Sequence, residues 1–226
     1  GRRIPTEAGE RFLDQARVME KEAATLATIA AAEPGDQPAR IRLSATPSLM
    51  RHILAPEVGT LLAATPGLHL ELLPGNENLD LDRGETDIAI RMKRPEKGDL
   101  QIRKLGEVRF DLFAAENVAG DNLPWLGYTD ALAHTPEAQA TGTPVVLRSD
   151  DPEILATAAR AGTGKVLLAS YLTRPGLKCL QEDVARREIW LAVQQNLAGS
   201  KMVRRVCDWA AGHITLALTS HLSTEN

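Results

Sequence analysis

The sequence predicts a two-lobed α/β domain, built from two parallel or mixed sheets with helices on both faces and preceded by a long coiled-coil helix. Three observations support this fold class. Residues 40–91 alternate between strand and helix periodicity, which favours a parallel sheet with right-handed crossovers. A second, smaller series of the same kind follows residue 116, and two extended strands connect the two series. Ahead of both, residues 12–30 carry an apolar heptad pattern.

The clearest element is the strand-turn-helix of residues 40–56. Ile41, Leu43 and Ala45 alternate with polar residues, as expected of a half-buried strand. The apolar residues then fall on one helical stripe, made of Met50, Ile53, Leu54, Val58, Leu61 and Leu62. Pro56 is expected to kink or break this helix.

Thr46, Pro47 and Ser48 form the turn between this strand and this helix. A helix start leaves backbone N–H groups free at the positive end of the helix dipole, and that arrangement suits an anion. We therefore interpret the turn as one half of a ligand site. The alternative is that the two hydroxyls only cap the helix.

The remaining elements follow from the same periodicities. Further strands are expected at residues 68–73, 87–91, 108–114, 125–128, 144–147, 166–169 and 189–193. Further helices are expected through Leu79 and Leu81 to Gly84, from Ser149 to Gly162, and at the C-terminus with Val203, Val206, Cys207, Ala210 and Ile214 on one face.

A binding cleft is expected between the two lobes. In open α/β sheets, ligands lie beyond the carboxyl ends of the strands. Polar residues directly follow such ends in this sequence, namely Thr46, Ser48, Asn76, Arg91, Thr129 and Ser149. We expect this cleft to bind a small organic anion, because hydroxyls, an amide and an arginine fork are suitable partners for a carboxylate. Arg91 and Arg148 have an open alternative, since an arginine at a strand end is often simply solvated.

The first helix is expected to mediate pairing between chains. Residues 1–5 resemble a cut end, and Thr6 is a suitable cap for a helix over residues 7–32. Its apolar seam is narrow and consists of Phe12, Ala16, Met19, Ala23, Leu26 and Ala30. This pattern is typical of a coiled coil; the alternative is an amphipathic helix docked on its own domain. Residues 33–38 contain two prolines and a glycine and are expected to form a linker.

Composition narrows the class of protein. Of the 226 residues, 43% are hydrophobic and 25% are charged, and no run approaches the ~18–20 apolar residues of a membrane span. Cys179 and Cys207 lack zinc or redox spacing, so buried thiols in the cytoplasm are favoured. With a net charge of −4 and no basic cluster, this chain is not expected to bind DNA itself.

Catalytic and metal sites find little support in the sequence. Residues 161–165 resemble a phosphate loop, but the required glycine and hydroxyl positions hold Ala159 and Val166. There is no Gly-x-Ser-x-Gly elbow and no zinc-ligand spacing among the histidines. We therefore expect no enzyme activity, no cofactor and no metal site. An enzyme with a covalent cofactor on Cys179 or Cys207 is the alternative from this class.

Several motifs, taken in order, resemble one family. They are Thr6-Glu-Ala-Gly9 before the heptad helix, Ile41 to Pro56, Pro66-Gly-Leu-His-Leu-Glu-Leu72, Arg83-Gly-Glu-Thr-Asp-Ile-Ala-Ile-Arg91, Ser149-Asp150 through Ala161-Gly-Thr-Gly164, Ile189-Trp-Leu191 and Ser200-Lys-Met-Val-Arg204. Together they are similar to the linker and effector-binding domain of LysR-type transcriptional regulators, and the resemblance covers essentially the whole chain.

The resemblance implies a periplasmic-binding-protein-like fold and a division of the chain. Residues 1–5 would be the remnant of a winged helix-turn-helix domain, 6–33 the dimerisation helix and 34–39 a hinge loop. Residues 40–115 with 190–226 would form lobe I, and residues 116–189 would form lobe II. DNA would be bound by a missing N-terminal domain and not by this part, and the protein would form dimers or tetramers.

The resemblance also implies a set of effector-binding residues. Family sites use a hydroxyl in the turn after the first strand, which falls on Thr46 and Ser48, and the loop after the second strand, which falls on Gly75 and Asn76. They also use the second lobe, where Thr163 and Lys165 depart from the usual apolar residues of the Gly-x-Gly turn. The predicted effector-binding residues are therefore Thr46, Pro47, Ser48, Asn76, Arg91, Thr129, Ser149 and Thr163. The rival interpretation is an extracytoplasmic solute-binding protein of a transport system, since the two-lobed fold is shared.

Overall fold

A computed structural model provides the structure of the chain. It describes residues 39–75, 85–96, 98–118, 122–172 and 175–220, together with Thr6 and the helical residues Gly9, Phe12, Leu13, Gln15, Ala16, Met19, Glu20 and Ala23. Of the hinge loop predicted over residues 34–39, Ala39 is the first residue of a strand and the other residues lie outside the described part of the chain. Leu26, Asn76 and the short helix expected to end at Gly84 also lie outside it.

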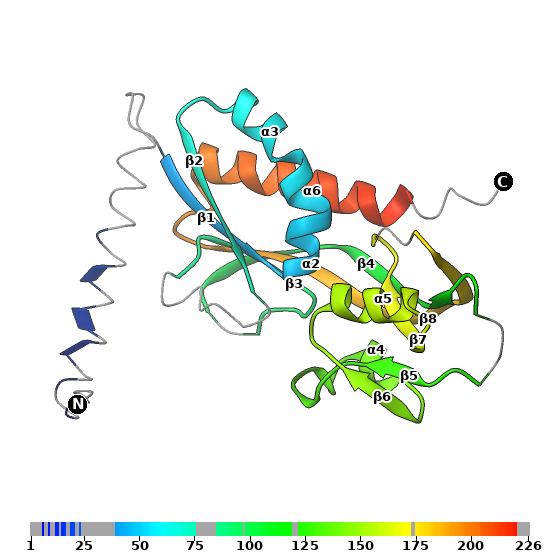
Figure 1. The fold of residues 1–226 in the computed structure, drawn as a ribbon. Coiled ribbons are helices and arrows are strands. Elements are labelled where there is room, and N and C mark those ends of the chain that lie inside the picture. Colours follow the sequence, from blue (N-terminus) through cyan, green and yellow to red (C-terminus); the bar gives the residue numbers. More distant parts are fainter. Residues whose placement is uncertain are drawn as a thin grey trace.

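One mixed sheet forms the centre of the domain, with the strand order β2-β1-β3-β8-β4-β7-β5-β6. Two long antiparallel strands, β4 (Leu100–Ala115) and β8 (Leu177–Gln194), lie in its middle and run from one end of the domain to the other (Figure 1). The two sheets expected from the sequence are therefore hydrogen-bonded into one, because β4 and β8 belong to both. The predicted lobe boundaries at residues 115 and 190 fall at or near the ends of these strands and stay predictions.

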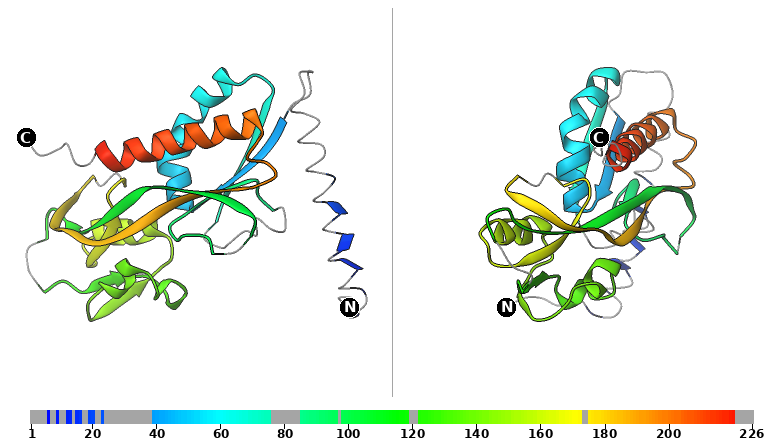
Figure 2. Two further views of the ribbon diagram at one scale, coloured as in Figure 1. Left: turned by 180° about the vertical axis from the view of Figure 1, so that it is seen from behind. Right: turned by 90° about the vertical axis from the view of Figure 1, so that its right-hand side faces the viewer.

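The first half of the domain contains β1 (Ala39–Ala45), β2 (Leu68–Pro74) and β3 (Ile88–Arg91). β1 pairs in parallel with both neighbours, as the sequence predicts, and β3 pairs antiparallel with β8. α3 (Ala55–Ala64) and the C-terminal helix α6 (Lys201–Ser220) lie on the same side of this half (Figure 2). All four residues of β3 are buried, which explains why the strand is apolar almost throughout.

The helical segment after β1 is continuous but changes its winding. α2 (Pro47–Leu49) passes into a π-helical stretch, η1 (Met50–Leu54), before α3 begins. Within η1 the Ala55 N–H donates to the Met50 carbonyl, five residues back. Pro56 has no N–H to continue the regular ladder and its ring crowds the preceding turn, so local widening accommodates it. The proline therefore changes the winding of the helix and does not end it.

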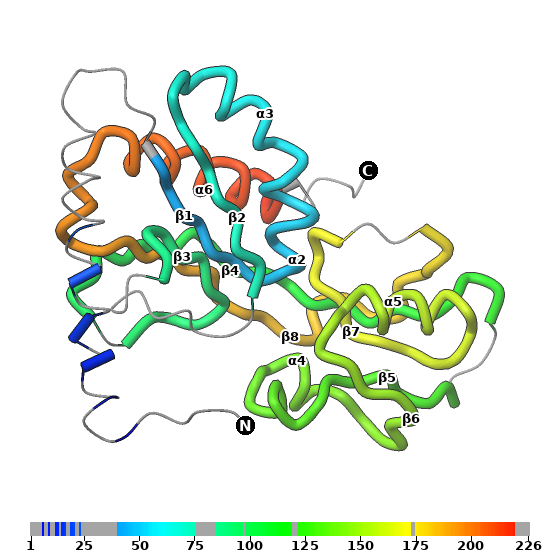
Figure 3. The backbone as a smooth tube through the Cα atoms, turned by 60° about the vertical axis from the view of Figure 1, so that its left-hand side comes forward, coloured from blue at the N-terminus to red at the C-terminus, as the bar shows by residue number. Residues whose placement is uncertain are grey.

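The described part of the second half contains three strands, two short α-helices and one turn of 3₁₀ helix, η2 (Asp130–Leu132). β5 (Trp125–Gly127) pairs in parallel with β6 (Val145–Arg148) and with β7 (Lys165–Ala169), and β7 pairs antiparallel with β4. α4 (Pro136–Gln139) and α5 (Pro152–Arg160) are each capped by the residue before a proline, Thr135 and Asp151. In Figure 3, β4 and β8 continue from the first half into this second half.

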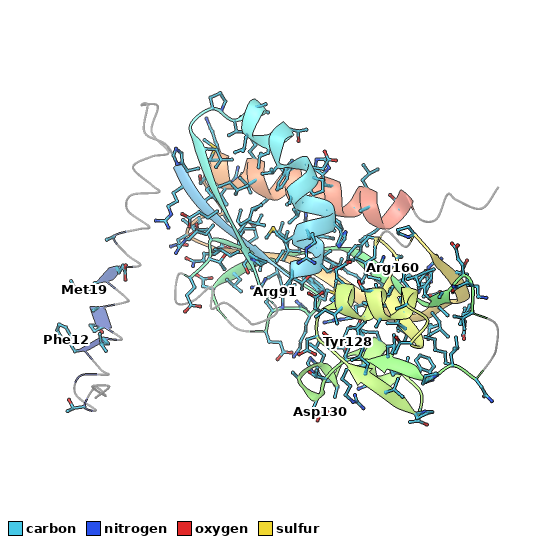
Figure 4. The ribbon with its side chains drawn as sticks, in the orientation of Figure 1. Phe12, Met19, Arg91, Tyr128, Asp130 and Arg160 are labelled. Atoms are coloured by element: carbon cyan, nitrogen blue, oxygen red, sulfur yellow. The ribbon has the colours of Figure 1, made fainter. Side chains whose placement is uncertain are left out.

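The described residues between Gly9 and Ala23 are helical, as the sequence predicts. Two apolar residues of the predicted seam are largely exposed, Phe12 at 74% and Met19 at 68%, and they lie away from the sheet in Figure 4. Ala16 and Ala23 are exposed as well. This exposure gives no support to a helix docked on its own domain, and pairing with a second chain stays a prediction.

Candidate functional site

A cavity of about 720 Å³ lies where the two halves of the domain meet. Its wall is formed by Thr46, Pro47, Ser48, Arg91, Met92, Lys93, Phe110, Tyr128, Ala131, Leu132, His134, Glu137, Asp150, Asp151, Pro152, Ala169, Tyr171, Leu172 and Arg187. The ends of β1, β3, β5 and β7 therefore converge on it. This is the place where ligands bind in open α/β sheets.

The turn after β1 brings three of the predicted residues, Thr46, Pro47 and Ser48, to the cavity. The Thr46 side chain accepts a hydrogen bond from the Leu49 N–H at 3.4 Å, so it caps the helix as well. Ser48 is 8% exposed, and its hydroxyl accepts a hydrogen bond from the Tyr171 hydroxyl at 3.1 Å. The same turn therefore both caps the helix, through Thr46, and lines the cavity.

Arg91 is the buried cation of the site. It lies at the end of β3, is 7% exposed, and faces the junction of the two halves (Figure 4). Its Nη2 donates to Ser44 Oγ at 2.9 Å and its Nη1 donates to the Ile90 carbonyl at 3.0 Å. Among the described residues no carboxylate pairs with it. Burial lowers the pKa of Arg91, which means that the charged guanidinium is held against a desolvation cost.

Glu137 and Arg187 form an ion pair on the wall contributed by the second half. Glu137 comes from α4 and is 2% exposed, and Arg187 comes from β8. Arg187 Nη1 donates to Glu137 Oε1 at 2.8 Å. Among the described residues, Glu137 Oε2 has no hydrogen-bond partner although it is buried.

Two buried tyrosines complete the wall. Tyr128 follows β5 and donates to the Leu167 carbonyl at 3.2 Å, while Tyr171 follows β7 and donates to Ser48. Burial raises the pKa of both phenols, so both remain neutral donors. Phe110, Leu132 and Leu172 add apolar surface beside them. The cavity therefore combines an apolar body with a few buried polar groups.

Three predicted site residues are not brought to this cavity. Thr129 uses both its N–H and its hydroxyl on Asp150 Oδ1, at 3.1 and 2.6 Å. Ser149 accepts from the Asp151 N–H at 3.1 Å, so its hydroxyl holds the start of α5. Thr163 is exposed in the turn at the opposite end of α5. Hydrogen bonds to neighbouring residues hold the Thr129 and Ser149 side chains away from the cavity. Thr163 lies away from it because α5 begins at the cavity wall and Thr163 follows the opposite end of this helix.

Sequence reasoning missed several residues of the wall. Tyr128 directly follows β5 and Tyr171 lies two residues after β7, so the rule that selected residues at strand ends also applies to them. Glu137 stands second in a helix with a threonine cap and a proline at its start, which is a recognisable signal. Arg187 lies inside β8 and reaches the cavity only through long-range strand pairing, for which its neighbourhood in the sequence gives no signal.

The described residues contain neither a metal-binding cluster nor a membrane-spanning helix. No group of three or more His, Cys, Asp or Glu side chains is placed to hold a metal ion within that part of the chain. No helix there is long and apolar enough to cross a membrane.

Comparison with known proteins gives the family. Residues 34–215 match the family model of the LysR substrate binding domain. The chain is 34% identical over 223 residues to the Mau operon transcriptional activator of Paracoccus denitrificans, with 93% of this chain and 77% of that protein covered. A shorter match, 40% over 62 residues, covers 27% of this chain and 18% of an HTH-type transcriptional regulator from Xanthomonas campestris pv. campestris (strain 8004).

Solved structures agree on the fold. The full-length structure of AphB, a LysR-family virulence activator of Vibrio cholerae, superposes with a TM-score of 0.70 at 22% identity, covering 94% of this chain and 83% of that chain. CrgA, a LysR-type transcriptional regulator from Neisseria meningitidis, gives 0.67 at 19% identity, covering 92% and 79%. By its matched domain and its curated relative, this chain belongs to the LysR family of transcriptional regulators and contains that family's effector-binding domain.

Proposed function

We propose that this chain senses a small organic anion, bound in the cavity between the two halves with its acidic group on Arg91. The sensing part would in this way control the DNA binding of a LysR-type regulator through an N-terminal helix-turn-helix domain. We place this activity in the cytoplasm, where the DNA is, and assign it to a homo-oligomer that pairs through the helix containing Phe12 and Met19.

The observation that carries the proposal is the state of Arg91. A buried charge without an opposite charge costs several kcal/mol, on the order of the whole stability of a domain, unless something compensates it. Among the described residues, Arg91 donates only to neutral oxygens, on Ser44 and Ile90. A guanidinium has more N–H donors than these two bonds use, and a carboxylate fits the remaining ones in bidentate geometry.

Neutral donors that line the same cavity as Arg91 favour an anion as well. The Ser48 hydroxyl accepts from Tyr171, so its own proton is available to a ligand. The Thr46 hydroxyl accepts from Leu49 and likewise retains a proton to donate. Each hydrogen bond to a charged ligand contributes ~1.5–3 kcal/mol, so three such contacts are enough for micromolar binding by a small acid.

A regulatory role is favoured over the two other candidate functions. The matched family and its curated relative regulate transcription, which disfavours the solute-binding component of a transport system. For catalysis we infer no role: the Thr46 hydroxyl accepts from the Leu49 N–H and the Ser48 hydroxyl accepts from Tyr171, so neither of these two hydroxyls of the described cavity wall is paired with a histidine or carboxylate that could act as a base.

The experiment is a thermal-shift screen of metabolites on the 226-residue chain, followed by calorimetry of the best ligand on Arg91→Met. Removal of the charge-assisted bonds should weaken binding about 10- to 150-fold. Arg40→Met is the matched control, because Arg40 is an exposed arginine of β1 whose guanidinium pairs with Glu71. Ligands that are uncharged, or equal losses in both variants, would refute the proposal.

A further inference from the structure

We propose that the ligand of this cavity carries a hydrogen-bond donor, a hydroxyl or an amino group, in addition to its acidic group, and that this donor binds the Glu137 carboxylate. The ligand class builds on the proposed function, in which Arg91 binds the acidic group. It narrows the candidates from organic anions in general to hydroxy acids and amino acids.

The buried charges of the domain single out two residues. Among the described residues, the charged side chains that are buried are Asp87, Arg91, Asp111 and Glu137. Asp87 and Asp111 each pair with an arginine and also accept a backbone N–H. The other two are the ones that line the cavity. The charged groups with unused hydrogen-bonding capacity therefore face the same space.

Glu137 has one satisfied and one unsatisfied oxygen. Oε1 accepts from Arg187 at 2.8 Å, whereas Oε2 is buried and lacks a hydrogen-bond partner among the described residues. A buried acceptor without a partner destabilises the ligand-free chain, because it has lost its water and gained no hydrogen bond in exchange. With only 2% of the residue exposed, bulk water is poorly placed to supply the bond. A group that enters the cavity can supply it.

The neighbouring phenols do not take this role. Both tyrosines of the wall are buried donors, but Tyr128 donates to the Leu167 carbonyl and Tyr171 donates to Ser48. A phenol has a single proton to donate. Neither tyrosine therefore satisfies Glu137 unless it gives up its present bond, which leaves the ligand as the donor.

Charge balance favours a hydroxyl over an ammonium group. Glu137 and Arg187 neutralise each other, and the acidic group of the ligand would neutralise Arg91. A hydroxyl satisfies Oε2 without disturbing either balance, whereas an ammonium group adds one positive charge to the buried part of the site. Asp150 and Asp151 on the same wall are only partly buried, and each already accepts a backbone N–H.

The test is a matched ligand series on the wild-type chain. Straight-chain carboxylates of about four to eight carbons are compared with their ω-hydroxy and ω-amino derivatives and with the corresponding uncharged alcohols by calorimetry. A donor that reaches Glu137 should improve affinity about 10- to 150-fold over the plain carboxylate at the matching chain length. The series that shows the gain identifies the donor as hydroxyl or amine.

Glu137→Gln then tests the residue itself. A glutamine keeps an oxygen for Arg187 but places an NH₂ group at the position of Oε2. The ratio of the affinities of the donor-bearing ligand and the plain carboxylate should therefore fall to about one. Glu137→Asp keeps the charge with a shorter reach and should lose part of the advantage. Glu188→Gln, an exposed carboxylate of β8 that pairs with Lys104, is the control and should retain all of it. Thermal denaturation of each variant verifies that it is folded.

The outcomes separate this inference from the proposed function. If carboxylates bind but the wild-type chain shows no preference at any chain length, the Glu137 subsite is wrong and the Arg91 site stands. If the preference persists in Glu137→Gln, another residue supplies the acceptor and the assignment is again wrong. If uncharged alcohols bind as tightly as the acids, or no member of the series binds, the proposed anion site at Arg91 is wrong. The inferred binding of a ligand donor by Glu137 is then wrong as well.

Discussion

The hydroxyl of Tyr171 donates a 3.1 Å hydrogen bond to the hydroxyl of Ser48, and this buried bond joins the second half of the domain to the first. Ser48 belongs to the turn before the first helix, and Tyr171 follows β7, so the two partners lie 123 residues apart in the chain. Both also line the cavity. The cavity wall and the contact between the halves therefore share the same hydroxyl groups.

Removal of the Ser48 hydroxyl should destabilise the ligand-free chain. Ser48→Ala leaves the Tyr171 phenol buried without its acceptor, at a cost of ~1–3 kcal/mol, or roughly 2–4 °C in Tm per kcal/mol. Tyr171→Phe removes the donor as well as the need for a partner and should cost about 1 kcal/mol. Urea denaturation of both single variants and the double variant gives the coupling energy. Strict additivity would mean that the bond contributes nothing.

Loss of the Arg91 charge should not destabilise the ligand-free chain, although we expect it to weaken anion binding about 10- to 150-fold. Arg91→Met removes a buried charge that has no acidic partner among the described residues, so the free energy of unfolding should remain equal or rise. Arg42→Met provides the contrast. Arg42 pairs with the buried Asp87 at 2.9 Å, and its loss should cost ~1–3 kcal/mol. Denaturant titration without ligand compares the free energies of unfolding of the two variants. Equal decreases would contradict the interpretation of Arg91 as a buried charge without an acidic partner.

The two thiols should differ sharply in reactivity. Burial raises the pKa of Cys207 to about 12, so at pH 8 only on the order of one in ten thousand molecules carries its thiolate. The expectation of two buried thiols is wrong for Cys179, which is exposed because it lies in the outward part of β8. A thiol reagent should therefore modify the native chain once, at Cys179, and a second time after denaturation. Mass spectrometry of the peptides checks the order; fast labelling of Cys207 in the native chain would refute it.

The first helix should mediate association of chains. Phe12 and Met19 are 74% and 68% exposed, and burial of each in a coiled coil is worth ~1.5–3 kcal/mol. The double substitution Phe12→Glu and Met19→Glu should lower the mass measured by light scattering. Gln15→Glu adds a charge beside the seam without removal of an apolar contact and should leave the mass unchanged. An unchanged mass in the double variant would place the contact elsewhere.

Local patterns in the sequence predict much of the first half. The strand-turn-helix from Ile41 onward, the parallel pairing of β1 and the buried strand before Arg91 all follow from periodicity within short windows. The full lengths of β4 and β8 do not. Residues 177–188 are mostly exposed, so no alternation of apolar and polar residues marks them as a strand. Their conformation comes from pairing with β4, which no local window contains.

The residues of the candidate site likewise include some that the sequence predicts and others for which the same rule fails. Thr46, Ser48 and Arg91 were predictable because strand ends in a parallel sheet point to one edge. The same rule also selected Thr129 and Ser149, whose hydroxyls are used in local bonds to Asp150 and Asp151. Position along a strand predicts where a side chain starts, but competition among nearby donors and acceptors decides where it points.

The pairing of β4 with β8, which extends from end to end of both strands despite three shifts in register, has a consequence for how the molecule unfolds. Leu100 pairs with Gln194 at one end of this ladder and Ala115 pairs with Leu177 at the other, so the same two strands supply edges to β3 and to β7. Neither half can melt without opening the ladder that holds the other. The two lobes should thus unfold together in a single cooperative step. A ligand that contacts both lobes should raise the midpoint temperature of that one transition.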